Sequence, residues 1–268
     1  MQRALYLFCL ARAGLVPEGR VAGLTDDSPL KVADFSGVAA VVCEVPLEDF
    51  SGPSAEARLQ DLTWIGPRAV RHDWVIDFVM QHSPVFPARF GTLFSSGERL
   101  ERMVKENAFS IHTFLDRVTN KDEWAVKGLA EREKAREALF LDRLARQSEV
   151  LDSLTPGVRY FKERQIRAEV DKDLNGRLKE QIRSVAARLT ECSADCRTRE
   201  VVLATQQSGE RDTMVNWAFL VERRNVEDLQ TRLCLANDEC NSRGLFFELS
   251  GPWPPYSFAP ALETEPGK

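Results

Sequence analysis

Two short apolar runs near the N-terminus predict buried β-strands. Residues 4–10 (ALYLFCL) and 38–43 (VAAVVC) are continuously apolar over a length that suits a strand covered on both faces. The chain between them is rich in glycine, proline and aspartate and has no periodic spacing of apolar residues, which is typical of a long exposed loop. We therefore expect two core strands joined by a loop.

A helical pattern follows after Pro46. Apolar residues recur at helical spacing from about residue 59 to residue 81. Gly66-Pro67 lies within this segment. Because proline lacks an amide hydrogen and clashes with the preceding turn, we expect the helix to kink or split there.

Three more elements complete the first half of the chain. They are a short extended stretch between Pro84 and Pro87, a helix over 98–117 and a strand over 124–126. The order strand, strand, helix, extended segment, helix, strand is close to a ferredoxin-like α+β sandwich, in which helices cover one face of a mainly antiparallel sheet. We predict a first domain over residues 1–130.

The second half begins with a helical hairpin, predicted over residues 131–195. Its composition turns to Ala, Arg, Glu, Leu and Lys, and Thr155-Pro156-Gly157 is expected to form the turn between two long helices. An apolar stripe follows the second helix among charged residues, which makes the hairpin coiled-coil-like. The stripe either packs on its own domain or docks another chain. Its members are Ile166, Val170, Leu174, Leu178, Ile182, Val185 and Leu189.

The remaining residues predict a second sheet over 196–258. Its three strands and one helix are expected over 201–204, 215–221, 245–249 and 226–241. Gly244 would end the helix. The second domain, residues 131–268, would combine this sheet with the hairpin and finish in a flexible tail over 259–268. The expected fold class is thus α+β, with two ferredoxin-like domains of which the second carries the hairpin.

Composition narrows the choice of partners. The 268 residues are 43% hydrophobic and 29% charged, and no apolar run approaches the roughly 18 to 20 residues that a membrane helix requires. The net charge of -5, with both signs interspersed, gives no basic footprint for nucleic acid. The N-terminal apolar run reads as a strand and not as a signal peptide, so we expect a cytoplasmic protein with neither nucleic acid nor membrane as a partner.

No catalytic motif is evident. The three histidines, His72, His82 and His112, fall on or just after the predicted helices, and no HExxH, nucleophile-elbow or glycine-rich phosphate-binding motif occurs. Surface or hydrogen-bonded helix residues are the favoured interpretation of all three. We predict neither an enzyme nor a cofactor.

Four cysteines offer a metal-binding or redox alternative. Cys192 and Cys196 are separated by three residues, and Cys234 and Cys240 by five. Structural zinc sites usually have closer pairs on turns, whereas Cys192 and Cys196 lie near the end of a predicted helix. Unrelated thiols are therefore favoured, and no metal ligand is predicted.

Three segments are unusual in composition. The first, Pro84 to Thr92, combines two prolines with Arg89-Phe90-Gly91-Thr92, and the second, Glu123 to Lys127, alternates large apolar and charged residues. The third, Ser250 to Phe258, is a proline-rich aromatic segment that favours polyproline II. This third segment either packs back onto the domain or presents Trp253 and Tyr256 as anchors for a partner.

These segments, taken in order, resemble the gas vesicle protein GvpL/GvpF family over nearly the whole chain. The other strings that carry the resemblance are Tyr6-Leu7, Glu44-Val45-Pro46-Leu47, His72, Met214-Val215-Asn216 and Ala218-Phe219-Leu220-Val221. Gly66-Pro67 departs from the first helix expected of the family.

The resemblance implies a non-enzymatic accessory role in the assembly of gas vesicles, the protein-walled organelles that give aquatic microbes buoyancy. It implies contact with the small, hydrophobic major shell protein GvpA, and contact with other accessory proteins is part of the same expectation. The protein would be an adaptor or chaperone, or a minor shell component, within the cytoplasm at the gas vesicle, and one location implied is the gas-facing surface of the shell. Two ferredoxin-like domains with a coiled-coil-like section are implied as well.

Arg89, Trp253 and Tyr256 are the candidate contact residues for this partner. Large apolar patches on an unassembled shell protein aggregate unless they are covered, and sheet edges, the helical hairpin or the aromatic segment could cover them. Two alternatives stay open. A ferredoxin-like ligand-binding protein or enzyme would have a polar pocket lined by His72 or Arg89, and a thiol- or metal-dependent regulator would bring the four cysteines together.

Overall fold

The computed structural model describes residues 2–16, 21–200 and 211–262, and it divides into two compact units. The first comprises Met1–Glu123 and Pro252–Lys268, and the second comprises Trp124–Gly251. The chain therefore enters the second unit within one strand, Lys121–Ala130, and leaves it within another, Leu245–Trp253. The division made from the sequence differs, because it kept the C-terminal segment in the second domain.

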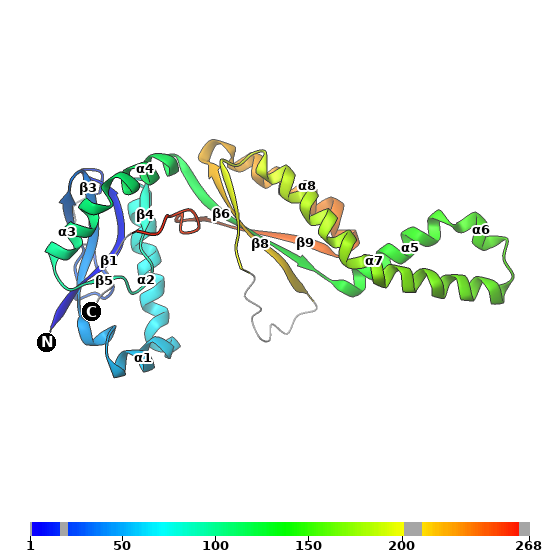
Figure 1. Ribbon diagram of the computed structural model, residues 1–268, viewed down its shortest axis with the longest axis horizontal. Helices are drawn as coiled ribbons and strands as arrows, with labels where there is room; N and C mark the ends of the chain where they lie inside the picture. Colours follow the sequence, from blue (N-terminus) through cyan, green and yellow to red (C-terminus); the bar gives the residue numbers. More distant parts are fainter. Residues whose placement is uncertain (1, 17–20, 201–210, 263–268) are drawn as a thin grey trace. The chain divides into compact units, whose positions relative to one another are not determined.

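The first unit is built on a five-stranded sheet (Figure 1). Its order is β2-β3-β1-β4, and β5 pairs with β1 on a separate path. The strands are β1 (Arg3–Arg12), β2 (Lys31–Phe35), β3 (Val38–Pro46), β4 (Val85–Pro87) and β5 (Leu93–Phe94). The two predicted core strands are confirmed as β1 and β3, which pair antiparallel with one register shift between Leu7 and Cys9.

Strand β2 was not expected, since its residues lie within the predicted loop. Its residues are half-buried or exposed, as suits an edge strand with few apolar contacts. Ser36 and Gly37 both have positive φ, 53° and 82°, which is the geometry of a two-residue type I′ turn closing β2 onto β3. The β-hairpin formed by β2 and β3 is therefore specified by its turn more than by the composition of β2.

Helices α1 (Pro53–Gln60) and α2 (Leu62–Met80) show that the helix is not split at Gly66-Pro67. Helix α2 continues through Pro67, and the break falls earlier, at Asp61. The Asp61 side chain accepts hydrogen bonds from the Thr63 amide (2.9 Å) and hydroxyl (2.7 Å), so it caps α2. Pro67 lies in the second turn, where its missing amide hydrogen removes only one helical bond.

The predicted helix over 98–117 is two helices, α3 (Gly97–Glu106) and α4 (Ala108–Val118). Asn107 separates them with a non-helical backbone (φ -104°, ψ 11°), and its buried amide group donates to the Met103 carbonyl oxygen at 2.9 Å. Asparagine side chains compete in this way with backbone hydrogen bonds. The apolar periodicity alone did not show this interruption.

The core of the first unit lies on both faces of β1. Six consecutive residues of β1, Tyr6 to Ala11, are buried, and because successive side chains alternate in direction, both faces must be covered. Tyr6 and Phe8 pack against His72 of α2, and Phe86 of β4 packs against Phe114 of α4. Cys9 and Cys43 are buried in this core as small apolar side chains, and burial raises the pKa of both thiols.

The second unit contains a four-stranded sheet in the order β7-β8-β6-β9. Its strands are β6 (Lys121–Ala130), β7 (Asp195–Thr198), β8 (Asp212–Glu222) and β9 (Leu245–Trp253). Strand β7 was not expected, because Asp-Cys-Arg-Thr has no apolar pattern. The strand predicted over 201–204 lies outside the described residues, as do residues 263–268 of the predicted tail.

The helical part of the second unit comprises α5 (Arg132–Arg146), α6 (Ser148–Asp152), α7 (Pro156–Thr190) and α8 (Val226–Cys240). All seven residues of the predicted apolar stripe on α7 are buried. Ile166 and Val170 pack against Phe140 of α5 and Leu151 of α6, while the stripe from Leu174 onward joins the core formed with the sheet and α8. The stripe thus serves its own unit and is not a free docking surface.

No helix in the described part of the chain is long and apolar enough to cross a bilayer.

Candidate functional site around His72

His72 lies at the centre of a buried polar cluster in the first unit. His72, on helix α2, is only 2% exposed. The hydroxyl of Tyr6 on β1 lies 2.8 Å from His72 Nδ1, and the Ala88 carbonyl oxygen lies 3.1 Å from His72 Nε2. Helix α2 therefore brings an imidazole against β1 and the segment after β4, where both ring nitrogens have partners.

These partners determine the tautomer of His72. Because a carbonyl oxygen can only accept, Nε2 carries the hydrogen and donates it to Ala88, and Nδ1 accepts from Tyr6. The Tyr6 oxygen accepts in turn from the Gly91 amide at 3.2 Å. Burial lowers the pKa of His72 and raises that of Tyr6, so both side chains are neutral at neutral pH.

Tyr256 attaches the C-terminal segment to the same cluster. Its hydroxyl donates to Asp73 Oδ1 at 3.2 Å, and its oxygen lies 3.2 Å from His72 Nε2, as a second acceptor for that N–H group. Burial, together with the negative charge of Asp73, raises the pKa of Tyr256. The hydroxyl of Tyr256 is thus directed at α2.

A second attachment follows at the next residue. Glu123 is fully buried, and its two carboxylate oxygens accept from the Ser257 amide and hydroxyl, both at 2.9 Å. Phe258 is buried beside them. A buried carboxylate without hydrogen-bond donors would be strongly destabilising, so these bonds fix the C-terminal segment on the first unit.

The Arg-Phe-Gly-Thr string forms a turn at the edge of the cluster. Gly91 has φ of 84°, as the third residue of a type II turn requires, and Thr92 donates to the Arg89 carbonyl oxygen through its amide (3.1 Å) and hydroxyl (2.7 Å). The Phe90 ring meets the His72 ring edge-on at 5.7 Å. The turn places Phe90 against the cluster and leaves the Arg89 side chain exposed.

The outer face of α2, which we define by Leu62, Val70 and Trp74, carries exposed apolar side chains. They are 81%, 70% and 45% exposed, respectively. Val70, Trp74 and Phe78 are spaced four residues apart and so lie along one side of the helix, where the Trp74 ring stacks on Phe78 at 5.9 Å. Exposed apolar groups that gather on one face make that face a candidate interaction surface.

Comparison with known proteins identifies the family. The family model described as "Gas vesicle synthesis protein GvpL/GvpF" matches residues 4–260. The chain belongs to the GvpL/GvpF family. Gas vesicle protein L of a Streptomyces strain is 24% identical over 266 residues, covering 98% of this chain and 95% of that protein. Gas vesicle protein L1 of Halobacterium salinarum is 25% identical over 250 residues, covering 88% and 83%.

Two crystal structures of GvpF share the fold. The GvpF structures from Microcystis aeruginosa and from Anabaena each match with a TM-score of 0.68 at 15% identity. They cover 96% and 97% of this chain, and 99% of their own chains. The relation to these two proteins is therefore one of fold along the whole length.

In this GvpL/GvpF chain, the candidate residues fall into two groups. Tyr256 has its hydroxyl in the His72 cluster, whereas Arg89 and Trp253 reach the surface, Trp253 with 42% exposure. Sequence reasoning missed Asp73 and the pairing of Ser257 with Glu123. The position of Glu123 directly before the apolar run Trp-Ala-Val in β6 was the available signal for a buried, hydrogen-bonded carboxylate.

The other histidines are as expected for hydrogen-bonded helix residues. His82 Nδ1 lies 2.9 Å from the Phe78 carbonyl oxygen, and His112 Nε2 lies 3.2 Å from the Ser36 carbonyl oxygen. Each pairing ties a ring nitrogen to a backbone acceptor. Neither is a pairing of a base with a nucleophile.

The four cysteines of the second unit are free thiols. Burial raises the pKa of Cys192, Cys196 and Cys240, which keeps these groups protonated and poor as nucleophiles or metal ligands. Within residues 2–16, 21–200 and 211–262, no group of three or more His, Cys, Asp or Glu side chains could hold a metal ion. Cys192, Cys196, Cys234 and Cys240, all in the described part of the chain, therefore do not converge on one metal site.

Proposed function

We propose that this protein acts in gas vesicle assembly by binding the shell protein GvpA, as an adaptor without enzymatic activity. Membership of the GvpL/GvpF family supports the gas vesicle role. The observation that carries the binding proposal is the outer face of α2, where Leu62, Val70 and Trp74 are exposed on a rigid helix. Such a face suits an apolar partner that must be covered before it polymerises.

Arg89 and Trp253 complete the proposed contact surface. Arg89 lies in a turn whose backbone is held by hydrogen bonds, so the backbone that carries its guanidinium group is fixed. Trp253 is partly exposed at the end of β9. We assign Tyr256 a supporting part in the contact. The hydrogen bonds of its hydroxyl group with Asp73 and His72 hold in place the segment that carries Trp253.

We also propose that each unit is a variant of the ferredoxin-like fold. In both units the sheet order is second, third, first, fourth strand, which is the order of a β-α-β-β-α-β arrangement. In the first unit the described residues between β1 and β2 include no helix, and in the second unit the corresponding position holds α5 to α7. The ion pairs between α5 and α7, such as Arg136 with Asp171 (2.8 Å), support a coiled-coil-like hairpin.

The proposed place of action is the gas vesicle within the cytoplasm, on the gas-facing surface of the shell if the protein is retained. An adaptor that leaves after assembly and a minor shell component differ in one observable. Immunoblots of washed, intact vesicles would contain a retained component and would lack a released adaptor. Contacts with other accessory proteins belong to either version of the proposal.

Co-purification with GvpA tests the binding proposal. Tagged protein is expressed with GvpA, and the GvpA recovered per adaptor is quantified. The double variant Val70→Asp/Trp74→Asp should recover at least about tenfold less GvpA, because two apolar contacts are replaced by charges. The matched control is Leu141→Asp/Val150→Asp, which adds the same charges at exposed apolar residues of the second unit. Equal recovery with all three proteins would exclude the outer face of α2 as the binding surface.

A further inference from the structure

Gly66 interrupts a row of exposed apolar side chains on the outer face of α2. Leu62, Gly66, Val70 and Trp74 follow one another at intervals of four residues, and residues with this spacing form a continuous ridge along a helix. Leu62 and Val70, on the two sides of the glycine, are 81% and 70% exposed. The ridge therefore has a gap of one side chain at Gly66.

No packing contact in the described part of the chain accounts for this glycine. Glycine is unfavourable inside a helix, because it loses more backbone freedom on folding than any other residue. An added Cβ at Gly66 would meet no described atom within 4 Å, so no neighbouring segment requires a glycine there. A missing side chain on an exposed apolar ridge does, however, allow the backbone of another protein to approach closely.

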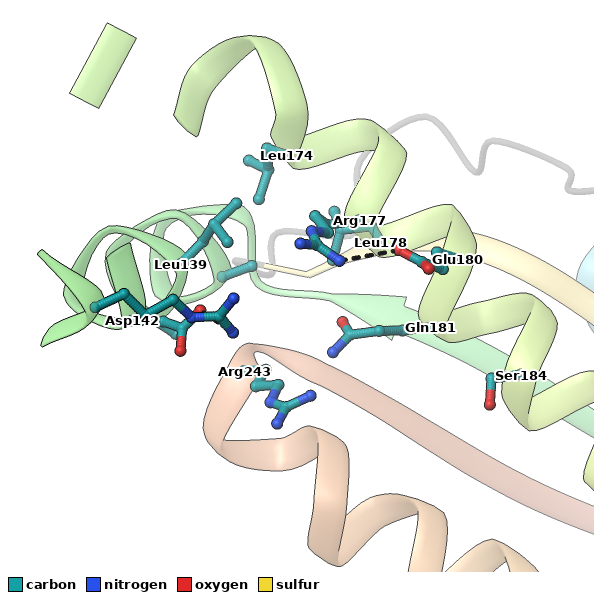
Figure 2. A pocket seen from close by; sticks show the side chains of 12 residues that line it. Leu139, Asp142, Leu174, Arg177, Leu178, Glu180, Gln181, Ser184 and Arg243 are labelled. Carbon is teal, nitrogen blue, oxygen red and sulfur yellow. Dashed lines mark hydrogen bonds and ion pairs between the residues drawn. The ribbon is translucent and has the colours of Figure 1, made fainter. Parts of the chain in front are cut away.

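Gly176 on α7 is a comparison within the same protein. It is also helical, and an added Cβ there would meet nothing within 4 Å. Its neighbours four residues away are Lys172 and Glu180, both charged and exposed. Figure 2 shows this part of α7, where Arg177 pairs with Glu180 (3.2 Å) beside a cavity of about 390 Å³ that both residues line. Gly176 thus lies on a charged surface, whereas Gly66 lies in an apolar ridge.

Two carboxylates flank the ridge. Asp73 and Asp77 are one turn apart on α2, on either side of Trp74 in the sequence. Neither forms an ion pair in the described part of the chain: Asp73 accepts from the Tyr256 hydroxyl at 3.2 Å, and Oδ1 of Asp77 has no hydrogen-bond partner there. Burial and the charge of Asp73 raise the pKa of Asp77, so a cation nearby would stabilise its charged form. The flank is therefore complementary to a lysine or an arginine.

The backbone of α2 limits how a partner can bind there. Its amide and carbonyl groups are used in helical hydrogen bonds, so a partner cannot add as a β-strand and must pack side chains on the ridge. Side-chain rows of this spacing pack into the grooves of a second helix, and a small residue at the crossing point shortens the distance between the two axes. At about 1.5 Å per residue, the ridge from Leu62 to Trp74 spans about 18 Å, which is long enough for a crossing helix.

We propose that the partner presents an amphipathic α-helix that crosses α2 at Gly66, with an apolar side chain seated between Leu62 and Val70 and a lysine or arginine paired with Asp77. This inference rests on the proposed function, in which the partner is GvpA, and it names the element by which the partner binds. The glycine selects a close crossing, and the carboxylates select a helix with a basic flank.

Glycine substitutions in the full-length protein test the crossing. Gly66→Leu adds an apolar side chain to an apolar surface, so a partner that only covers this surface should bind at least as well as before. A helix that crosses at Gly66 should instead be recovered at least about tenfold less, with Gly66→Ala between Gly66→Leu and wild type. The measurement is GvpA recovered by co-purification. Gly176→Leu is the matched control, because it makes the same change at another open helical position.

Synthetic helices test the same inference without GvpA. The probe is a fluorescent peptide of about 20 residues with an apolar stripe flanked by lysines, and the comparison peptide has glutamate in place of lysine, both measured by anisotropy. The lysine peptide should bind the full-length protein at least about tenfold more tightly than the glutamate peptide. Gly66→Leu and Asp77→Asn should each weaken its binding. Asp238→Asn should not, because Asp238 is an exposed carboxylate on α8.

The two measurements separate this inference from the proposed function. Wild-type recovery of GvpA by Gly66→Leu, together with its loss in Val70→Asp/Trp74→Asp, would overturn the crossing helix and leave the proposed function intact. Binding of the lysine peptide without recovery of GvpA by wild type would support the crossing helix and contradict GvpA as the partner. Absent binding of the lysine peptide, equal binding of both peptides, or self-association of the wild type that Gly66→Leu abolishes would overturn the inference.

Discussion

The ring nitrogens of His72 accept from one tyrosine and donate to a backbone carbonyl and a second tyrosine. This chain of bonds joins β1, α2, the turn after β4 and the C-terminal segment through single side chains. A protonated His72 would present two donors, so Tyr6 could no longer donate its hydroxyl hydrogen to Nδ1. The cluster is therefore built for a neutral imidazole.

Stability should fall as pH drops below 6.5, where an unfolded histidine begins to bind a proton. Burial lowers the pKa of His72 in the folded state, so the unfolded state binds a proton first as the pH falls. The contribution of His72 to stability is therefore present above pH 6.5 and lost below it. The slope from this group can approach about 1.4 kcal/mol per pH unit. Denaturant unfolding at pH 7.5, 6.5 and 5.5 measures it.

His72→Gln is the control for this prediction, since glutamine does not titrate. The free energy of unfolding of His72→Gln should depend less on pH over the same interval. The pKa of Asp77 is raised by burial and by Asp73, so its protonation changes the free energy of unfolding with pH in the opposite direction. Because Asp77 is present in both proteins, its effect cancels in the comparison. Identical slopes for wild type and His72→Gln would show that His72 is not the titrating group.

Tyr256→Phe should lower the free energy of unfolding of the first unit by about 1 to 2 kcal/mol. The substitution keeps the ring but removes the hydroxyl that donates to Asp73 and accepts from His72. Tyr160→Phe is the matched control, because Tyr160 is exposed on α7 in the other unit. A loss in the control as large as in Tyr256→Phe would contradict this assignment.

At the scale of elements, backbone geometry at two glycines predicts effects of opposite sign. Gly244→Ala should destabilise the second unit by more than about 1 kcal/mol, because its φ is positive and the added Cβ meets the Ala135 amide. Gly176→Ala should stabilise α7 by about 0.5 to 1 kcal/mol, because Gly176 lies within the helix and an added Cβ meets nothing within 4 Å. Thermal unfolding of both variants checks the pair, and two shifts of equal sign would contradict it.

Elements with a strong apolar pattern were predictable, and those defined by single polar residues were not. The stripe on α7 and the strands β1 and β3 follow from periodicity because burial is what selects their residues. The helix ends at Asp61 and Asn107 depend on local side-chain bonds that periodicity does not contain. The edge strands β2 and β7 bury little, so their composition carried almost no signal.

At the scale of the whole molecule, the C-terminal segment belongs to the first unit although the sequence placed it in the second. The attachment depends on two side-chain contacts, Tyr256 with α2 and Ser257 with Glu123. The proline-rich aromatic segment could be identified from the sequence, but the residues that it contacts could not. No local pattern indicates which distant residues a segment contacts. For the same reason, Tyr256 could not be distinguished from the more exposed Trp253.

Truncation after Gly251 should destabilise the first unit selectively. It removes the donors to Glu123 and leaves a buried carboxylate without these bonds, at a cost of several kcal/mol. Hydrogen exchange followed by mass spectrometry should show faster exchange in β1 and α2, while α7 and α8 keep their protection. Unchanged exchange in β1 and α2 would show that the segment does not stabilise the first unit.

The most direct test of the proposed function is gas vesicle formation in a strain that lacks this protein. Vesicles are counted by electron microscopy after complementation with wild type, with Val70→Asp/Trp74→Asp or with Leu141→Asp/Val150→Asp, at equal levels of folded protein. We expect full rescue by wild type and by the control in the second unit, and few or no vesicles with the α2 variant. Normal vesicles in the strain without any complementing protein, or full rescue by the α2 variant, would contradict an assembly role that acts through the outer face of α2.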